Sequence, residues 1–469
     1  MVLTAARPRF GVPGAVVWYP ESLQLHGTSP TSIAQYLEPA AVPYGVLHER
    51  YGAVLEMQQR MLGVIPNCNP LLEIWPVSFR TYGILVPNFL NMPLPLFGVG
   101  VPARYLGFAM YTSSRAARCM YCSAHGCAFA MRRGMAPSKL AAAIDAESSD
   151  LFDDKELAII RASRGLSSVP LSLRDDDIVA IQRSFSAAHV EWIMLVPIMM
   201  GYLNKCMDAL GMELEQAVFD EVEHVIAPSG WEPGRHALKD NGQPTRPFAV
   251  DSLWQHAGLL RVLPWALAAD LSWTKGVPSS WPQVGDFLEQ RVGSRFPILE
   301  RVSPGRVRKA LATIIRDNLA PESSILGAAR KHLAGLVCGA FLDNGELAAL
   351  ARALLDASTD GARLGLHEAG LEDIARLARE PLALEDAVAL EQATRRLRAN
   401  GLDDVATSVV LLTRGLSESP ARVPPALLSS HGAQLQPAAL VELITWVSVC
   451  HLLHRLITWY RRVDALAAP

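Results

Sequence analysis

The stretch Cys119-Met120-Tyr121-Cys122-Ser123-Ala124-His125 is the most informative part of this chain, because its cysteines and histidine recur at a spacing of three. Residues three apart on a helix lie on the same face, one turn from each other, so all three side chains can meet one small substrate. If the helix begins near Cys119, its N-terminal dipole and the neighbouring imidazole both favour thiolate over thiol. The stretch therefore predicts a thiol enzyme with one sulfur acting as a nucleophile at neutral pH.

Around this stretch, the chain has helical character wherever it is periodic. Apolar residues recur every three or four positions in the segments 154–163, 176–185, 188–212, 307–318, 346–355, 384–399 and 437–463. Alternating β-branched strands bounded by tight turns are almost absent. We expect an all-α fold in which the cysteines lie on a helix from about 115 to 133, closed by Gly134.

The length of 469 residues is typical of more than one domain, and we expect two. A Gly-, Pro- and polar-rich stretch at 226–250 marks the boundary, and a linking helix with Trp254 and Trp265 follows it. The expected division is an N-terminal extension at 1–39, a helical domain with the cysteines at 40–225, a linker region at 226–290 and a second helical domain at 291–469.

An internal echo indicates that the two domains are related. The segment Arg-Gly-Leu-Ser-Ser-Val-Pro at 164–170 recurs as Arg-Gly-Leu-Ser-Glu-Ser-Pro at 414–420, an offset of 250 residues, and each copy follows an apolar helix. The second copy contains only Cys338 and Cys450. We therefore expect a duplicated helical unit whose second copy keeps the scaffold and lacks the thiol pair.

The composition excludes several classes of partner. A net charge of −3 with 19% charged residues gives no electrostatic reason to expect nucleic acid or an anionic membrane. The apolar stretches 82–110 and 192–203 are interrupted or too short to span a bilayer, and the first residues do not resemble a secretory signal. Seven cysteines spread over a long chain form no disulfide framework, so we expect a cytoplasmic protein.

The cysteine stretch resembles the carboxymuconolactone decarboxylase and alkylhydroperoxidase D (AhpD) superfamily, and its peroxidase-related members in particular. The family pattern is a Cys-x-Tyr-Cys pair with a His one turn on, although many members have the His one residue later. Ser114 also matches, and the segments 202–211 and 230–234 resemble the family's closing helix and tail. The resemblance covers roughly residues 40–235, and it implies two tandem AhpD-like helical domains, the second degenerate.

The resemblance also implies a function. Cys122 is expected to be the peroxidatic thiol, Cys119 the resolving thiol and His125 part of a proton relay, in an antioxidant enzyme that reduces an organic hydroperoxide. Further residues expected in substrate binding or in the relay are Tyr111, Ser114 and Tyr121. The redox-active cysteine pair needs no bound cofactor or metal. The expected partners are a small organic substrate, a dithiol reductant protein and further copies of the chain.

One departure from the family keeps other functions open. Peroxidase members carry a Glu about a dozen residues before the first cysteine, and the segment 105–109 has no carboxylate there. A decarboxylase, isomerase or biosynthetic oxidoreductase on the same scaffold, or a non-catalytic binding protein like the sestrins, would fit this difference. Cys119, Cys122, His125 and Cys127 are also a conceivable metal set, and all four are alternatively core residues. We expect an apolar substrate pocket lined by 84–106 and 192–203.

Overall fold

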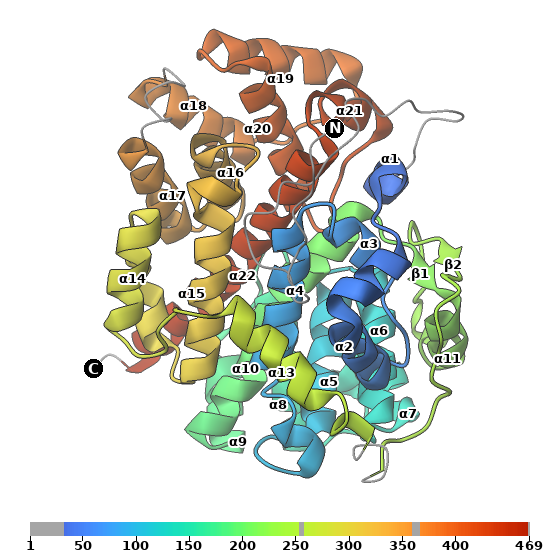
Figure 1. Ribbon diagram of the computed structural model, residues 1–469. Coiled ribbons are helices and arrows are strands. Elements are labelled where there is room, and N and C mark those ends of the chain that lie inside the picture. The colour runs from blue at the N-terminus through green and yellow to red at the C-terminus, as the bar shows by residue number, and fades with distance from the viewer. Residues whose placement is uncertain (1–31, 253–257, 359–365, 468–469) are drawn as a thin grey trace.

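The computed structural model describes residues 32–252, 258–358 and 366–467, and it confirms the all-α prediction (Figure 1). Most of the expected extension at 1–39, and Trp254, lie outside the described residues. The α-helices are α1 (Ile33–Leu37), α2 (Tyr44–Leu62), α3 (Asn69–Leu72), α4 (Pro76–Phe89), α5 (Ala103–Ala116), α6 (Met120–Arg132), α7 (Pro137–Ala142), α8 (Asp154–Ser167), α9 (Asp175–Ser184), α10 (Ala187–Leu210), α11 (Gln216–Ile226), α13 (Leu263–Trp273), α14 (Gln283–Val292), α15 (Gly305–Leu319), α16 (Ala328–Phe341), α17 (Gly345–Ala357), α18 (Glu368–Arg379), α19 (Ala387–Ala399), α20 (Asp404–Ser417), α21 (Pro425–Ser430) and α22 (Pro437–Ala467). Short 3-10 helices are η1 (Glu38–Ala40), η2 (Leu94–Phe97), η3 (Ala143–Ser148), η4 (Ala227–Ser229), η5 (Pro297–Arg301), η6 (Pro321–Ser323) and η8 (Gly432–Gln434).

The helix ends follow from ordinary capping chemistry. Asp153 and Glu156 form a capping box at the start of α8, in which each side chain satisfies a backbone N–H that the helix leaves free. Ser186 caps α10, and Gly211 ends it in the left-handed conformation that glycine adopts at no steric cost. All seven segments with helical periodicity are helices to within a few residues, namely α8, α9, α10, α15, α17, α19 and α22.

The helices of the two halves correspond in order and in packing. The pair α8 and α20 and the pair α10 and α22 each begin 250 residues apart, as the sequence echo predicts. The hairpin of α5 and α6 has its counterpart in α16 and α17, which begin 225 residues later. In both halves the first helix of the hairpin packs against the echo helix, α8 or α20. The positions of the domain boundaries stay a prediction.

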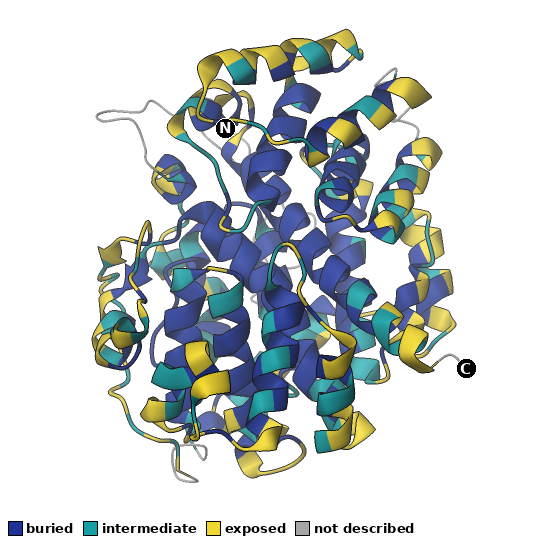
Figure 2. Cartoon of the chain, turned by 180° about the vertical axis from the view of Figure 1, so that it is seen from behind, coloured by how far each residue is buried: buried dark blue, intermediate teal, exposed yellow. Residues whose placement is uncertain are grey.

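The central element of the fold is the pair α10 and α22, which pack along each other (Figure 1). A Cβ added to Gly201 would lie 2.8 Å from the carbonyl oxygen of His451, so only glycine permits this approach. By length and composition both helices are apolar enough to cross a membrane, yet their apolar windows are entirely buried inside the protein (Figure 2). They are the core on which both halves are built.

Two buried cationic side chains lie at equivalent positions on α10 and α22, and each bonds to the opposite half of the chain. Lys205 of α10 donates to the carbonyl of Glu418, just after α20. Arg455 of α22 lies 250 residues later and donates to Ser167 at the end of α8, and to Pro197 on α10. Each central helix therefore holds the end of the echo helix in the opposite half.

The described residues of the expected linker region at 226–290 include η4, β2, α13 and most of α14. The two-residue strands β1 (Leu214–Glu215) and β2 (Leu238–Lys239) pair in parallel. The helix α13 packs across α2 and α4, with Trp265 61% exposed on its outer side. A segment expected to serve only as a connection therefore covers part of the first half.

Candidate active site

The two cysteines lie where a turn joins α5 to α6, so the helix expected over 115–133 begins later than predicted, at Met120, and ends as predicted, at Arg132 before Gly134. Arg118 adopts a left-handed conformation with φ 55°, and Cys119 is extended, which breaks the helix before Met120. Cys119 is the N-cap of α6: its sulfur accepts the backbone N–H of Cys122 at 3.3 Å. The sulfur of Cys119 thus lies against the first turn of the helix that carries Cys122.

Cys122 is buried, and its environment opposes ionisation. Its thiol donates to the carbonyl of Leu203 on α10 at 3.5 Å, and only 5% of the residue is exposed. Burial raises the pKa of the Cys122 thiol well above its usual value, and the hydrogen bond with Cys119 adds to this. This direction is opposite to the lowered pKa expected at the N-terminus of a helix, because burial removes the water that would stabilise a thiolate.

A buried carboxylate, that of Glu215 on β1, lies beside two side chains of α6. Its Oε1 accepts a hydrogen bond from the Tyr121 hydroxyl at 2.8 Å, and its Oε2 lies 2.7 Å from His125 Nε2. The backbone N–H of Asn67 donates to it as well. Glu215 is 3% exposed, so this is a buried network in which both α6 side chains turn toward a carboxylate.

The remaining predicted residues lie at different distances from the thiols. The Ser114 hydroxyl donates to Asn204 on α10 at 3.0 Å, and its carbonyl accepts the N–H of Cys119. The Tyr111 hydroxyl accepts from Arg115 at 3.3 Å, and burial raises its pKa to about 12. Among the described residues, no hydrogen bond joins Tyr111 to either cysteine.

Two more buried thiols and a tyrosine extend the cluster. Burial raises the pKa of Tyr82 well above its usual value, and the nearby Cys68, Glu215, Cys122 and Cys206 raise it further. The same cause, burial, raises the pKa values of Cys68 and Cys206. Within the described ranges, the Tyr82 hydroxyl has no hydrogen-bond partner, so its donor is free for a ligand.

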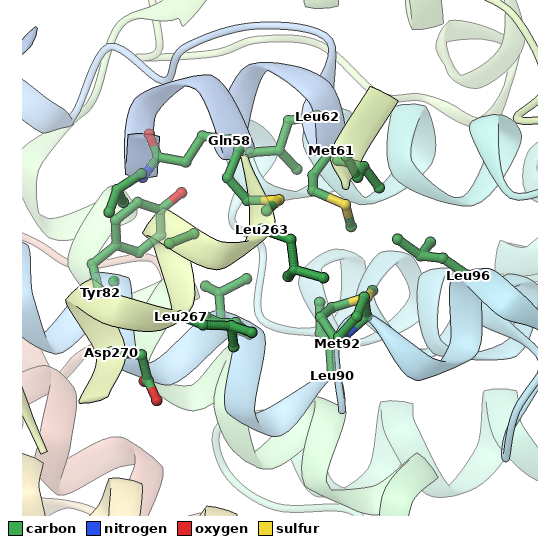
Figure 3. Close-up of a pocket in the computed structure, with 18 of the residues that line it drawn as sticks. Gln58, Met61, Leu62, Tyr82, Leu90, Met92, Leu96, Leu263, Leu267 and Asp270 are labelled. Carbon is green, nitrogen blue, oxygen red and sulfur yellow. The ribbon is translucent and has the colours of Figure 1, made fainter. Parts of the chain in front are cut away.

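Tyr82 also lines an apolar cavity of about 120 Å³ (Figure 3). Met61 comes from α2, Leu90 follows α4, and Leu263 and Leu267 point into the cavity from α13. The expected lining by 84–106 is met in part, by residues between Val86 and Leu96. Residues 192–203 do not line this cavity, because that part of α10 is packed against α22. The roof is instead α13.

The residues considered as a metal set do not converge. His125 is directed at Glu215, and the Cys127 thiol lies 3.7 Å from the sulfur of Met131. In the described ranges, no group of three or more His, Cys, Asp or Glu side chains is arranged to hold a metal ion.

Glu215 is the residue that the sequence did not reveal. It lies in a two-residue strand more than 90 residues after Cys122, where helical periodicity carries no information. The only local signal is that Gly211 ends α10, which lets the chain return toward α6.

The comparisons with known proteins find a likeness over part of the chain. No family model matches the chain, and no curated protein matches it. Over 39% of its length the chain is structurally similar to debrominase Bmp8. The apo crystal structure of Bmp8 is 21% identical, with 96% of Bmp8 covered and a TM-score of 0.36. A cysteine-to-alanine variant of Bmp8 in complex with 2,3,4-tribromopyrrole is 22% identical, with 95% covered and a TM-score of 0.35. A likeness at this level supports no conclusion about activity.

Proposed function

We propose that the chain is a thiol-dependent oxidoreductase that reduces a small apolar organic hydroperoxide through Cys119 and Cys122. The observation that carries the proposal is the cap of α6, which holds the sulfur of Cys119 against the N–H of Cys122. Both cysteines are free thiols, so they are available to form one disulfide. A short loop of this kind closes readily on oxidation.

The reaction consumes one hydroperoxide and two thiols. Cys122 loses its proton to the His125–Glu215 pair, and the thiolate attacks the distal peroxide oxygen. The O–O bond breaks, the alcohol leaves with a proton returned from the same pair, and Cys122 becomes a sulfenic acid. The Cys119 thiol condenses with it, which releases water and forms the disulfide. An external dithiol protein then reduces the disulfide.

The raised pKa of Cys122 fits an enzyme that ionises its thiol only when substrate is bound. The substrate would occupy the cavity under α13, where the Tyr82 hydroxyl can donate to a polar atom of an otherwise apolar molecule. A volume of about 120 Å³ suits a single ring or a short chain. Tyr82 would then lie between the substrate and the thiols.

A second candidate is reductive cleavage of a carbon–halogen bond in a small aromatic ring, which is the class of activity that the name of Bmp8 states. The electron balance is the same: two thiols become a disulfide, hydrogen replaces the halogen, and hydrogen halide is released. The size and apolar walls of the cavity favour a ring of this kind. It is one of the non-peroxidase oxidoreductases that the departure from the family pattern leaves open.

The test is to mix fully reduced protein with cumene hydroperoxide or with 2,3,4-tribromopyrrole and to locate the oxidised cysteines by alkylation and peptide mass spectrometry. We expect loss of two thiols per chain, at Cys119 and Cys122. Turnover with a dithiol should fall at least about 1000-fold in Cys122→Ser. Loss of thiols with only one of the two compounds identifies the reaction.

The matched control is Cys119→Asn, because asparagine is a strong N-cap residue. This variant should stay folded and should stop at the Cys122 sulfenic acid, which is trapped with dimedone. Intact thiols with both compounds would contradict both candidates and leave a binding protein.

A further inference from the structure

Arg455 is a buried cation, and none of the described carboxylates forms an ion pair with it. It is 4% exposed, and its guanidinium donates to the hydroxyls of Ser113 and Ser167 and to the carbonyls of Ser167 and Pro197. All four acceptors are neutral. A buried charge is costly unless an opposite charge compensates it, so this arrangement calls for an anion.

The other buried cations show what is usual in this protein. Among the Lys and Arg residues that the described ranges bury, the following pair with carboxylates: Arg80 with Asp317, Arg132 with Glu221, Lys331 with Glu442 and Arg414 with Glu418. Within the described residues only Lys205 and Arg455, which occupy equivalent positions on α10 and α22, have no such ion pair. The two buried cations without an ion pair therefore both lie on the central helices.

The thiol site is a candidate for that anion, because Arg455 and Cys122 both contact α10. Arg455 packs against α10, where a Cβ added to Gly201 would lie 3.1 Å from its Cδ. The Cys122 thiol contacts the same helix two residues further on, at Leu203. Arg455 also contacts Ser113, in the last turn of α5 before the cysteine turn. Burial lowers the pKa of Arg455 to about 9, and ionised Cys122 is the neighbour that raises it.

We propose that Arg455 is a positioning residue whose charge balances the Cys122 thiolate, so that the second half of the chain completes the thiol site of the first. This rests on the proposed thiol chemistry at Cys122. A guanidinium held by neutral oxygens keeps its full charge available when the thiol ionises. The degenerate half is then required for the chemistry as well as for the fold.

Other charged and titratable groups surround this pair. Besides burial, Cys119, Asp208 and Cys206 raise the pKa of Cys122, and they oppose Arg455. Asp208 is itself bonded to Arg235. On α22, His451 and His454 have lowered pKa values because of burial, with Arg455 contributing. Lys205 lowers the pKa of His451 further, and Tyr82 of α4 faces Cys122. Arg455 is the cation whose pKa ionised Cys122 raises, whereas the pKa of Lys205 is raised by Asp208 and Cys338.

The test measures the ionisation of Cys122 directly. In a Cys119→Asn background, the rate of alkylation of Cys122 by iodoacetamide is followed from pH 6 to 11 by peptide mass spectrometry. We expect Arg455→Met to raise the apparent pKa of Cys122 by about 1 or more, and Arg455→Lys to restore most of the difference. Lys205→Met is the matched control. This variant removes the equivalent buried cation, whose ammonium group bonds to the second half. The apparent pKa of Cys122 should stay within a few tenths of the parent value.

A second comparison needs no Arg455 variant and stays informative if Arg455→Met does not fold. Cys122→Asp and Cys122→Asn have the same shape and differ in charge. With a cation beside the site, Cys122→Asp should unfold at the same or higher urea concentration than Cys122→Asn at pH 7.

The proposal is overturned by an unchanged alkylation profile in folded Arg455→Met, or by a Cys122→Asp protein that is clearly less stable than Cys122→Asn. Neither measurement depends on turnover. If Arg455→Met shifts the alkylation profile of Cys122 but the protein reduces neither the hydroperoxide nor the carbon–halogen bond, only the proposed function is overturned.

Discussion

The cysteine turn of the first half has a counterpart in the second half with the same backbone and different chemistry. Arg118 and Asp343 both adopt left-handed conformations, with φ 55° and 50°. Cys119 caps α6 by accepting from Cys122, and Asn344 caps α17 by accepting from Leu347 at 2.9 Å. The turn therefore forms without sulfur.

The difference between these turns indicates what the thiols are for. Asparagine caps a helix better than cysteine, so stability alone would not select Cys119. In the second half, Asn344 also contacts His454 at 3.0 Å, and leucine fills the place of Cys122. The second-half turn serves packing and capping, whereas the first-half turn holds two thiols and has the weaker N-cap residue.

The largest expected effect uses the buried carboxylate of the second half. Glu442 pairs with Lys331 at 2.9 Å and accepts backbone N–H groups of Ile325 and Leu326. Glu442→Gln leaves Lys331 buried without an anion and should reduce the free energy of unfolding by about 3–5 kcal/mol. Urea unfolding measures this loss. The rate of Cys122 alkylation in the folded fraction should be unchanged. A slower alkylation would contradict the view that Glu442 serves stability alone.

The same substitution in the first half should have the opposite outcome. Glu215→Gln keeps the shape that Tyr121, His125 and Asn67 contact, but it removes the charge that supports proton transfer. We expect turnover to fall about 100-fold while the urea midpoint moves little. Steady-state kinetics beside urea unfolding separates the two effects. Normal turnover would remove Glu215 from the mechanism.

Alkaline pH should weaken the first half before the second. Burial raises the pKa values of Cys68, Cys122, Cys127 and Cys206, whereas Cys450 is the second-half cysteine with a raised value among the described residues. The folded state keeps these protons when the unfolded chain releases them. The stabilisation is therefore complete below about pH 9 and is lost as the pH rises, by about 1.4 kcal/mol per pH unit for each thiol.

Hydrogen exchange at pH 8 and pH 10, corrected for intrinsic rates, measures this difference. Amides of α6 and α10 should lose protection before those of α16 and α20. Equal losses in both halves would show that the thiols are not the cause.

The smallest effect comes from exchanging the caps. Cys119→Asn and Asn344→Cys should each change the free energy of unfolding by about 1 kcal/mol or less, the first upward and the second downward. Urea unfolding of the two variants measures both changes in the free energy of unfolding. A loss of several kcal/mol in Cys119→Asn would mean that the sulfur has a structural role that the second half does not share.

The sequence predicted what local periodicity can encode. Helices such as α8 and α22 were recognisable because their apolar residues repeat at helical spacing, and the thiol pair because its partners are three residues apart. The break before Cys119 was missed, since Arg118 adopts a left-handed conformation that usually signals itself through glycine. Glu215 and the roof helix α13 reach the site through tertiary packing, which leaves no local pattern.

The position of α22 between the two halves also has a genetic consequence. Its 31 residues contact the first half through Thr445 and Ser78 as well as through Arg455. A stop codon or frameshift upstream of α22 would remove the central helix beneath both halves. A gene interrupted there should therefore yield no folded first half, even though the codons for that half are intact.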